Sequence, residues 1–137
     1  MTTYEIAWGL DETEPTGQPV RQVQSAAELD AVLDEISATE QFMVTIYPVG
    51  GEPDGPSMQI GIGHPQRGFV LWLGSDPGYA VDLDNEPLGE DLTFDYGGEP
   101  TDYGPARTRV SSEQVRQAVR EFVATGARPR FAAGKNE

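Results

Sequence analysis

Cysteine is absent from this chain of 137 residues, and histidine occurs once, as His64. The missing cysteine excludes disulfide bonds, thiolate nucleophiles and zinc–thiolate centres. His64 lies in a turn-like segment, residues 64–68, where we interpret it as a solvated loop histidine. The sequence also lacks a Gly-x-Ser-x-Gly motif and a phosphate-binding glycine loop. With no combination of nucleophile, base and orienting acid, the chain is predicted not to be an enzyme.

Long apolar runs and targeting signals are also missing. No apolar stretch approaches the ~20 residues that a membrane helix requires. Residues 1–5 do not show the basic region and apolar run of a secretion signal. These absences predict a cytoplasmic protein with no membrane contact.

Basic side chains are scarce, and they are unevenly distributed. The chain has 23 acidic and 9 basic residues, which gives a net charge of −14. Residues 1–106 hold 20 acids and two arginines, whereas residues 107–137 hold seven bases and three acids. Because neutralising phosphates requires clusters of lysine and arginine, this composition disfavours nucleic acid as a partner.

The segment from Gly68 to Ala106 contains no lysine or arginine at all. Such a segment repels nucleic acids and anionic lipids and attracts cationic surfaces. Aromatic residues are interleaved with its acids: Trp72, Tyr79, Phe94, Tyr96 and Tyr103. Its nine carboxylates are Asp76, Asp82, Asp84, Glu86, Glu90, Asp91, Asp95, Glu99 and Asp102.

Two amphipathic helices are predicted. The first covers residues 25–37, where Ser25 and Glu28 match a capping box. The second begins after Ser111, which forms a similar box with Gln114, and ends at Gly126. The expected apolar stripes are Leu29, Val32, Leu33 and Ile36 in the first helix, and Val115, Ala118, Val119 and Phe122 in the second.

Between the helices, strand-like segments alternate with short turns. The segments are residues 42–47, 57–63, 69–73 and 79–83, and their short turns favour an antiparallel meander. Residues 92–96 can pair as a further strand, although glycine and proline surround them.

We predict an α+β fold, with an antiparallel sheet of about five or six strands and two helices packed on one face. The length suits one domain, residues 1–137. Within it, residues 1–24 are interpreted as an N-terminal strand and acidic loop, and residues 132–137 as a frayed tail.

Carboxylates interleaved with aromatics can steer a basic partner and then anchor it. Trp72 lies in the most apolar strand and is expected in the core, whereas the sequence does not decide whether Tyr96 and Tyr103 are buried. The predicted partner-binding residues are Asp82, Asp84, Glu86, Asp91, Asp95 and Tyr96.

The same region offers one candidate metal site. Asp82, Asp84 and Glu86 stand at alternate positions, a spacing that suits carboxylate ligands of calcium. However, Pro87 occupies the position where an EF-hand loop has glycine. No metal or cofactor is therefore predicted, and a small calcium- or ligand-binding module remains an alternative.

The C-terminal block, residues 110–129, carries a family resemblance. It consists of the capped helix with Phe122 near its end, followed by Thr125-Gly126-Ala127-Arg128-Pro129. With this C-terminal block the chain resembles the Imm1 family of bacterial immunity proteins. The resemblance covers about residues 25–131. The tryptophan that often follows Arg-Pro in that family is replaced here by the segment that begins with Phe131.

The resemblance implies a cytoplasmic protein that binds and inhibits a cognate toxin, most often a nucleic-acid deaminase, by blocking its active-site cleft. No catalytic residue carries over, because the family acts by binding. An acidic surface suits a toxin whose substrate cleft is basic. A stand-alone interaction protein of the same fold is a further alternative, and the oligomeric state is left open.

Overall fold

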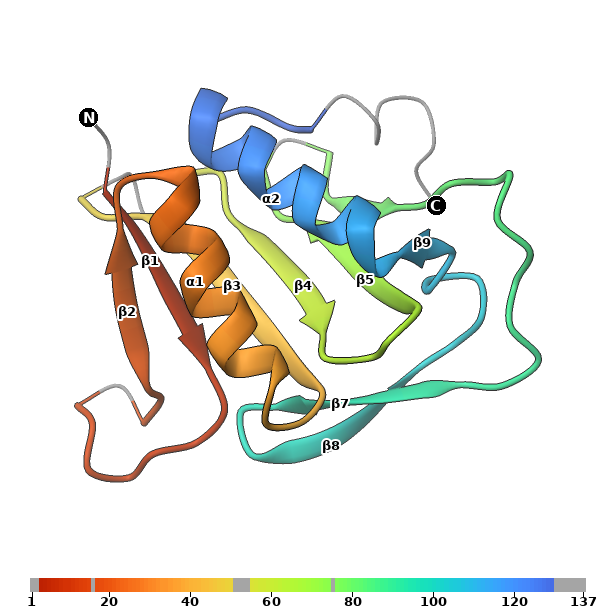
Figure 1. The fold of residues 1–137 in the computed structure, drawn as a ribbon, viewed down its shortest axis with the longest axis horizontal. Helices are drawn as coiled ribbons and strands as arrows, with labels where there is room; N and C mark the ends of the chain where they lie inside the picture. The colour runs from red at the N-terminus through yellow and green to blue at the C-terminus, as the bar shows by residue number, and fades with distance from the viewer. Residues whose placement is uncertain (1–2, 16, 51–54, 75, 130–137) are drawn as a thin grey trace.

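Nine strands and two helices occupy the described part of the chain, which is residues 3–15, 17–50, 55–74 and 76–129 of this computed structural model (Figure 1). The predicted frayed tail, residues 132–137, lies outside the described residues. In chain order the elements are β1 (Tyr4–Trp8), β2 (Val20–Val23), α1 (Ala26–Ser37), β3 (Phe42–Pro48), β4 (Met58–Ile62), β5 (Arg67–Trp72), β6 (Gly78–Ala80), β7 (Leu92–Tyr96), β8 (Glu99–Tyr103), β9 (Val110–Ser111) and α2 (Ser112–Thr125).

Six of the strands form one antiparallel path in the order β2-β1-β3-β4-β5-β6. The β7–β8 hairpin joins β3 through one parallel pair, Phe42 with Asp95, and β9 pairs with β5. The α+β class and the meander from β3 to β6 are confirmed, but the sheet has nine strands rather than five or six. The prediction missed β2 and β9 because they are short, and β8 because polar residues and Pro100 stand where apolar alternation would mark a strand.

Both helices lie on the same face of the sheet, as Figure 1 shows. Ser25 accepts from the amide of Glu28, but the Glu28 carboxylate accepts from Gln24, one residue before the predicted partner. The box at the start of α2 is reciprocal, since Ser111 and Gln114 each cap the other's amide. Gly126 ends α2 in the left-handed region, at φ 71°, where glycine has no steric penalty.

The two faces of the sheet are covered differently. The face toward the helices carries the larger core, to which β3, β4 and β5 contribute alternate apolar residues. Among the described residues, the opposite face is covered at one end only, where the β7–β8 hairpin lies over β4 and β5. That second cluster is built from Met43, Phe69, Leu92, Phe94 and Tyr103.

Gly61 is the position that lets the hairpin close. A Cβ atom on Gly61 would lie 2.3 Å from the Phe69 ring and 3.0 Å from Phe94. Phe69 is fully buried and stacks on Tyr103 at a centroid distance of 4.0 Å, so its ring has no room to withdraw. Glycine at this position therefore fixes how closely the hairpin approaches the sheet.

We predict that Gly61→Ala lowers the free energy of unfolding by ~1–3 kcal/mol, because the added methyl group displaces the Phe69 ring from a close-packed cluster. Urea denaturation measures this. Gly89→Ala is the matched control, since a Cβ there meets no atom within 4 Å, and it should change stability by less than about 0.5 kcal/mol. Equal stability of the two variants would contradict this account of the packing.

Candidate functional site

Asp82 holds the start of the loop between β6 and β7 in place. Its amide donates to the Arg109 carbonyl at 3.0 Å, and its carboxylate accepts from Gln114 Nε2 at 2.7 Å and from the Asp84 amide at 2.9 Å. These bonds turn the chain after Ala80, so the strand predicted over residues 79–83 ends early. The carboxylate of Asp82 is thus engaged inside the protein.

Arg109 anchors the same loop from the other side. Its guanidinium donates to the carbonyls of Asn85 at 2.8 Å and Leu83 at 2.6 Å. The Asn85 amide donates to Gln114 Oε1 at 2.9 Å, so Gln114 joins the loop to the first turn of α2 as well as capping the helix. The sequence predicted only the capping role of Gln114, and no local pattern marked Arg109, because both bonds depend on which loops the fold brings together.

Of the predicted residues in this loop, Asp84 and Glu86 are exposed. Their side chains form no hydrogen bond or ion pair within the described part of the chain. Among the described residues, no three carboxylate or imidazole side chains lie close enough together to hold a metal ion. Asp82, Asp84 and Glu86 therefore do not converge as calcium ligands would.

The other predicted residues belong to the β7–β8 hairpin or precede it. Asp91 is exposed just before β7, and the Asp95 carboxylate accepts from the Gly98 amide at 2.7 Å, which stabilises the hairpin turn. Tyr96 is 44% exposed and accepts a hydrogen bond from Gln59 Nε2 at 3.5 Å. Tyr103, by contrast, is 5% exposed and belongs to the core.

The six predicted residues thus form two groups. The loop that bears Asp82, Asp84 and Glu86 runs down the right-hand edge of Figure 1, beside the start of α2, and β7 crosses the bottom. Asp95 and Tyr96 lie toward the far end of β7. The two groups are connected by further acids along the loop and the hairpin. We call this surface the acidic band, and it comprises Asp84, Glu86, Glu90, Asp91, Asp95 and Glu99.

Three of the four carboxylates of α1 form ion pairs with arginine at the protein surface. Asp30 lies 3.1 Å from Arg120 and 3.6 Å from Arg116, which also reaches Asp34 at 2.9 Å. Glu35 pairs with Arg21 of β2 at 3.3 Å. Arg116 and Arg120, one helical turn apart on α2, therefore pair with the acids of the neighbouring helix α1.

The acidic band keeps its charge. Within the described residues, five exposed carboxylates of this band have no side-chain partner: Asp84, Glu86, Glu90, Asp91 and Glu99. Exposed carboxylates without a cation nearby create a negative potential that extends about 8 Å into physiological salt. This band therefore presents a group of unpaired negative charges to a partner, and further exposed acids such as Glu12 and Glu40 lie elsewhere on the surface.

His64 has a structural role in its turn. Its Nδ1 accepts from the amides of Gln66 at 3.1 Å and Arg67 at 3.0 Å, and the residue is half-buried rather than fully solvated. A cleft of about 430 Å³ lies beside it, lined also by Ser112, Arg116 and Asp34. Because Ser112 donates to the Pro65 carbonyl and Arg116 pairs with Asp34, these side chains are engaged with the fold and do not form a nucleophile–base pair.

In the part of the chain that the structure describes, neither helix has the length and apolar character needed to cross a bilayer.

The site is thus an α+β sheet that displays exposed carboxylates with no ion-pair partner among the described residues. A family model described as Immunity protein Imm1 matches residues 17–133. The chain belongs to this family of immunity proteins, as the resemblance of its C-terminal block implied, and the match extends beyond the predicted range at both ends.

Among solved structures, the fold is similar to the crystal structure of a hypothetical protein from Neisseria gonorrhoeae. The TM-score is 0.53 and the identity 11%, with 93% of this chain and 90% of that chain covered. At this identity the likeness shows the fold alone. No curated protein matches the chain.

We predict that Arg109→Leu loosens the loop between β6 and β7. The variant loses two hydrogen bonds from a charged donor, each worth ~1.5–3 kcal/mol when buried, and the loop is partly exposed. The hydrogen-bonded backbone amides of Asp84 and Asn85 should exchange with deuterium about tenfold faster or more. Arg107→Leu is the control, since Arg107 contacts Tyr79 and does not bond this loop; equal exchange in both variants would show that Arg109 is not the anchor.

Two tyrosines should lose their protons at a higher pH than a free tyrosine does. Burial raises the pKa of Tyr103 to about 12, and burial together with the hydrogen bond to Glu5 raises the pKa of Tyr47 to about 12. Because the folded state holds these protons more tightly than the unfolded chain, stability is full below about pH 10 and falls as pH rises from about 10 to about 12. Urea denaturation from about pH 9 to about pH 11 should show this fall, and Tyr47→Phe should reduce its slope. Tyrosine absorbance that titrated entirely near pH 10 would contradict the assignment.

Proposed function

We propose that this immunity protein inhibits a nucleic-acid deaminase toxin by covering the basic substrate cleft of the toxin with the acidic band. One observation carries the proposal: three of the four acids of α1 form ion pairs with Arg21, Arg116 and Arg120, whereas the exposed acids of residues 84–99 have no cationic partner among the described residues. The inhibitor would act in the cytoplasm of the cell that produces the toxin.

The chemistry of such a toxin supports the match. An enzyme that acts on a polyanion presents a groove of lysine and arginine, which carboxylates can occupy in place of phosphates. Opposite charges steer the two proteins together and raise the association rate above the ~10⁵–10⁶ M⁻¹s⁻¹ of uncharged partners. Rapid capture suits an inhibitor that must act before its toxin reaches a substrate.

The residues take different roles in this proposal. Asp84, Glu86 and Asp91 supply exposed charge, and Tyr96 supplies an aromatic anchor at the end of β7. Asp95 stabilises the hairpin turn while remaining partly exposed. Asp82 shapes the loop that presents the charges.

The test is a paired charge reversal, Glu86→Lys with Asp91→Lys. Both residues are exposed and have no side-chain partner among the described residues, so the fold should be unaffected. Affinity for a catalytically inactive form of the toxin domain encoded by the neighbouring gene should fall about 10- to 100-fold, mainly through a slower association rate. Surface plasmon resonance at low and high salt measures both quantities.

The control reverses two exposed acids away from the band, Glu12→Lys with Glu35→Lys, which changes the net charge equally and breaks only the exposed ion pair of Glu35 with Arg21. It should change the affinity by less than about threefold. Equal losses in the two variants would show that only the overall charge matters. If the wild-type chain does not bind the toxin domain, the proposed function fails.

A further inference from the structure

Half of the sheet has side chains on the face opposite the helices that no described element covers. Thr45, Gln59, Leu71 and Tyr79 are cross-strand neighbours in one row from β3 to β6. Each is half-buried, whereas the residues that alternate with them, such as Ile60 and Val70, are fully buried under the helices. Tyr79, at one end of the row, packs partly against the second cluster, and the rest of the row is open to solvent on one side.

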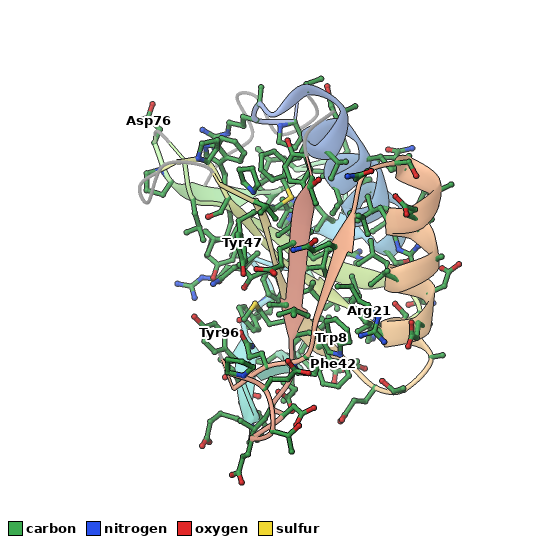
Figure 2. All side chains as sticks on the ribbon, turned by 90° about the vertical axis from the view of Figure 1, so that its left-hand side faces the viewer. Trp8, Arg21, Phe42, Tyr47, Asp76 and Tyr96 are labelled. Carbon is green, nitrogen blue, oxygen red and sulfur yellow. The ribbon has the colours of Figure 1, made fainter. Side chains whose placement is uncertain are left out.

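A second row lies beside the first. Glu5 of β1 pairs with Tyr47 of β3, and the Tyr47 hydroxyl donates to the Glu5 carboxylate. Figure 2 shows Tyr47 and Tyr96 on the side of the sheet away from α1. We call these two rows the open sheet face, which comprises Glu5, Thr45, Tyr47, Gln59, Leu71 and Tyr79.

The open sheet face is continuous with the hairpin. The β7–β8 hairpin covers only the next row, where Met43, Gly61 and Phe69 are cross-strand neighbours. The hydrogen bond from Gln59 to the Tyr96 hydroxyl, at 3.5 Å, crosses the boundary between the two surfaces. One molecule that docks on the open sheet face would therefore also contact the end of the acidic band.

The side chains of this face have the composition of a binding surface. Its centre is tyrosine, leucine, threonine and glutamine, with the charge at its border, which is the arrangement found in protein interfaces. Tyrosine gives a large contact area with little loss of conformational freedom, and it is enriched where binding energy concentrates. The cation at the border, Arg107, lies over the Tyr79 ring at 5.0 Å, where its stacking also covers part of the ring.

We propose that the toxin docks on the open sheet face, with an apolar segment flanked by lysine or arginine, while the acidic band covers the adjoining cleft. This inference rests on the proposed function. Charge complementarity identifies the occupant, because the carboxylates that border the face, Glu5 and Asp95, match a basic protein and oppose an acidic one such as a second copy of this chain at −14.

The dimensions of the sheet agree with a joint interface. The open sheet face lies on five strands, which at a spacing of ~4.8 Å span about 19 Å, and two rows of side chains extend about 14 Å along the strands. The open sheet face therefore offers roughly 270 Å² in projection, against ~800 Å² per partner in a standard protein interface. The hairpin and the exposed loop supply the remainder.

The test introduces the same substitution at two glutamines on opposite sides of the molecule. Gln59→Arg places a bulky cation at the centre of the open sheet face, whereas Gln117→Arg places it on the exposed side of α2. Binding of the inactive toxin domain encoded by the neighbouring gene is measured by calorimetry. Gln59→Arg should weaken binding about 100-fold, as expected at the centre of an interface, and Gln117→Arg by less than about threefold.

A second measurement does not depend on a variant. Hydroxyl-radical labelling of the wild-type chain, with and without the toxin domain, should show protection of Tyr47, Tyr79 and Tyr96 in the complex, while Tyr4, buried under the helices, should not change.

The outcomes separate the two proposals. If Glu86→Lys with Asp91→Lys weakens binding but Gln59→Arg does not, and the three tyrosines stay unprotected, the docking inference is overturned and the proposed function stands. If the wild-type chain does not bind the toxin domain, both are overturned. A Gln59→Arg protein that fails to fold leaves the labelling result to decide.

Discussion

The contact between Gly61 and Phe69 determines how the rest of this structure is arranged. Phe69 and Val70, adjacent in β5, are both fully buried, one on each face of the sheet. Val70 belongs to the core under the helices, and Phe69 to the cluster under the hairpin. Because Gly61 has no side chain, the Phe69 ring can lie across β4. There it packs against Phe94 and Tyr103 of the hairpin.

That arrangement leaves two distinct surfaces, the open sheet face and the acidic band. The hairpin seals one end of the far face, which gives β7 and β8 a fixed position although glycine and proline interrupt their sequence. The remaining rows stay open, and the acidic loop is tied to the start of α2 by Asp82, Arg109 and Gln114. The charged and the open surfaces are thus both held by the folded chain before any partner binds, which lowers the entropic cost of association.

The carboxylates of this protein are of two kinds, those paired with arginine and those without a cationic partner among the described residues. The arginines of α2 face α1 and pair with Asp30 and Asp34, which offsets part of the negative charge of the helical layer. The carboxylates of the loop and hairpin have no such partner in the described residues and project their field outward. The net charge of −14 therefore understates how strongly one side of the protein would attract a basic partner.

The sequence by itself determined the elements whose signals are local. Capping residues and helical periodicity located both helices, alternation located β4, and strand-like apolar runs located β3 and β5, because these patterns depend on neighbours within a few residues. The C-terminal block was enough to identify the family. Only the tertiary structure decided that β2, β8 and β9 join the sheet, that Asp82 is engaged by Gln114, and that Tyr103 is buried while Tyr96 is exposed. Each of these depends on a contact between segments distant in the chain, which no local pattern records.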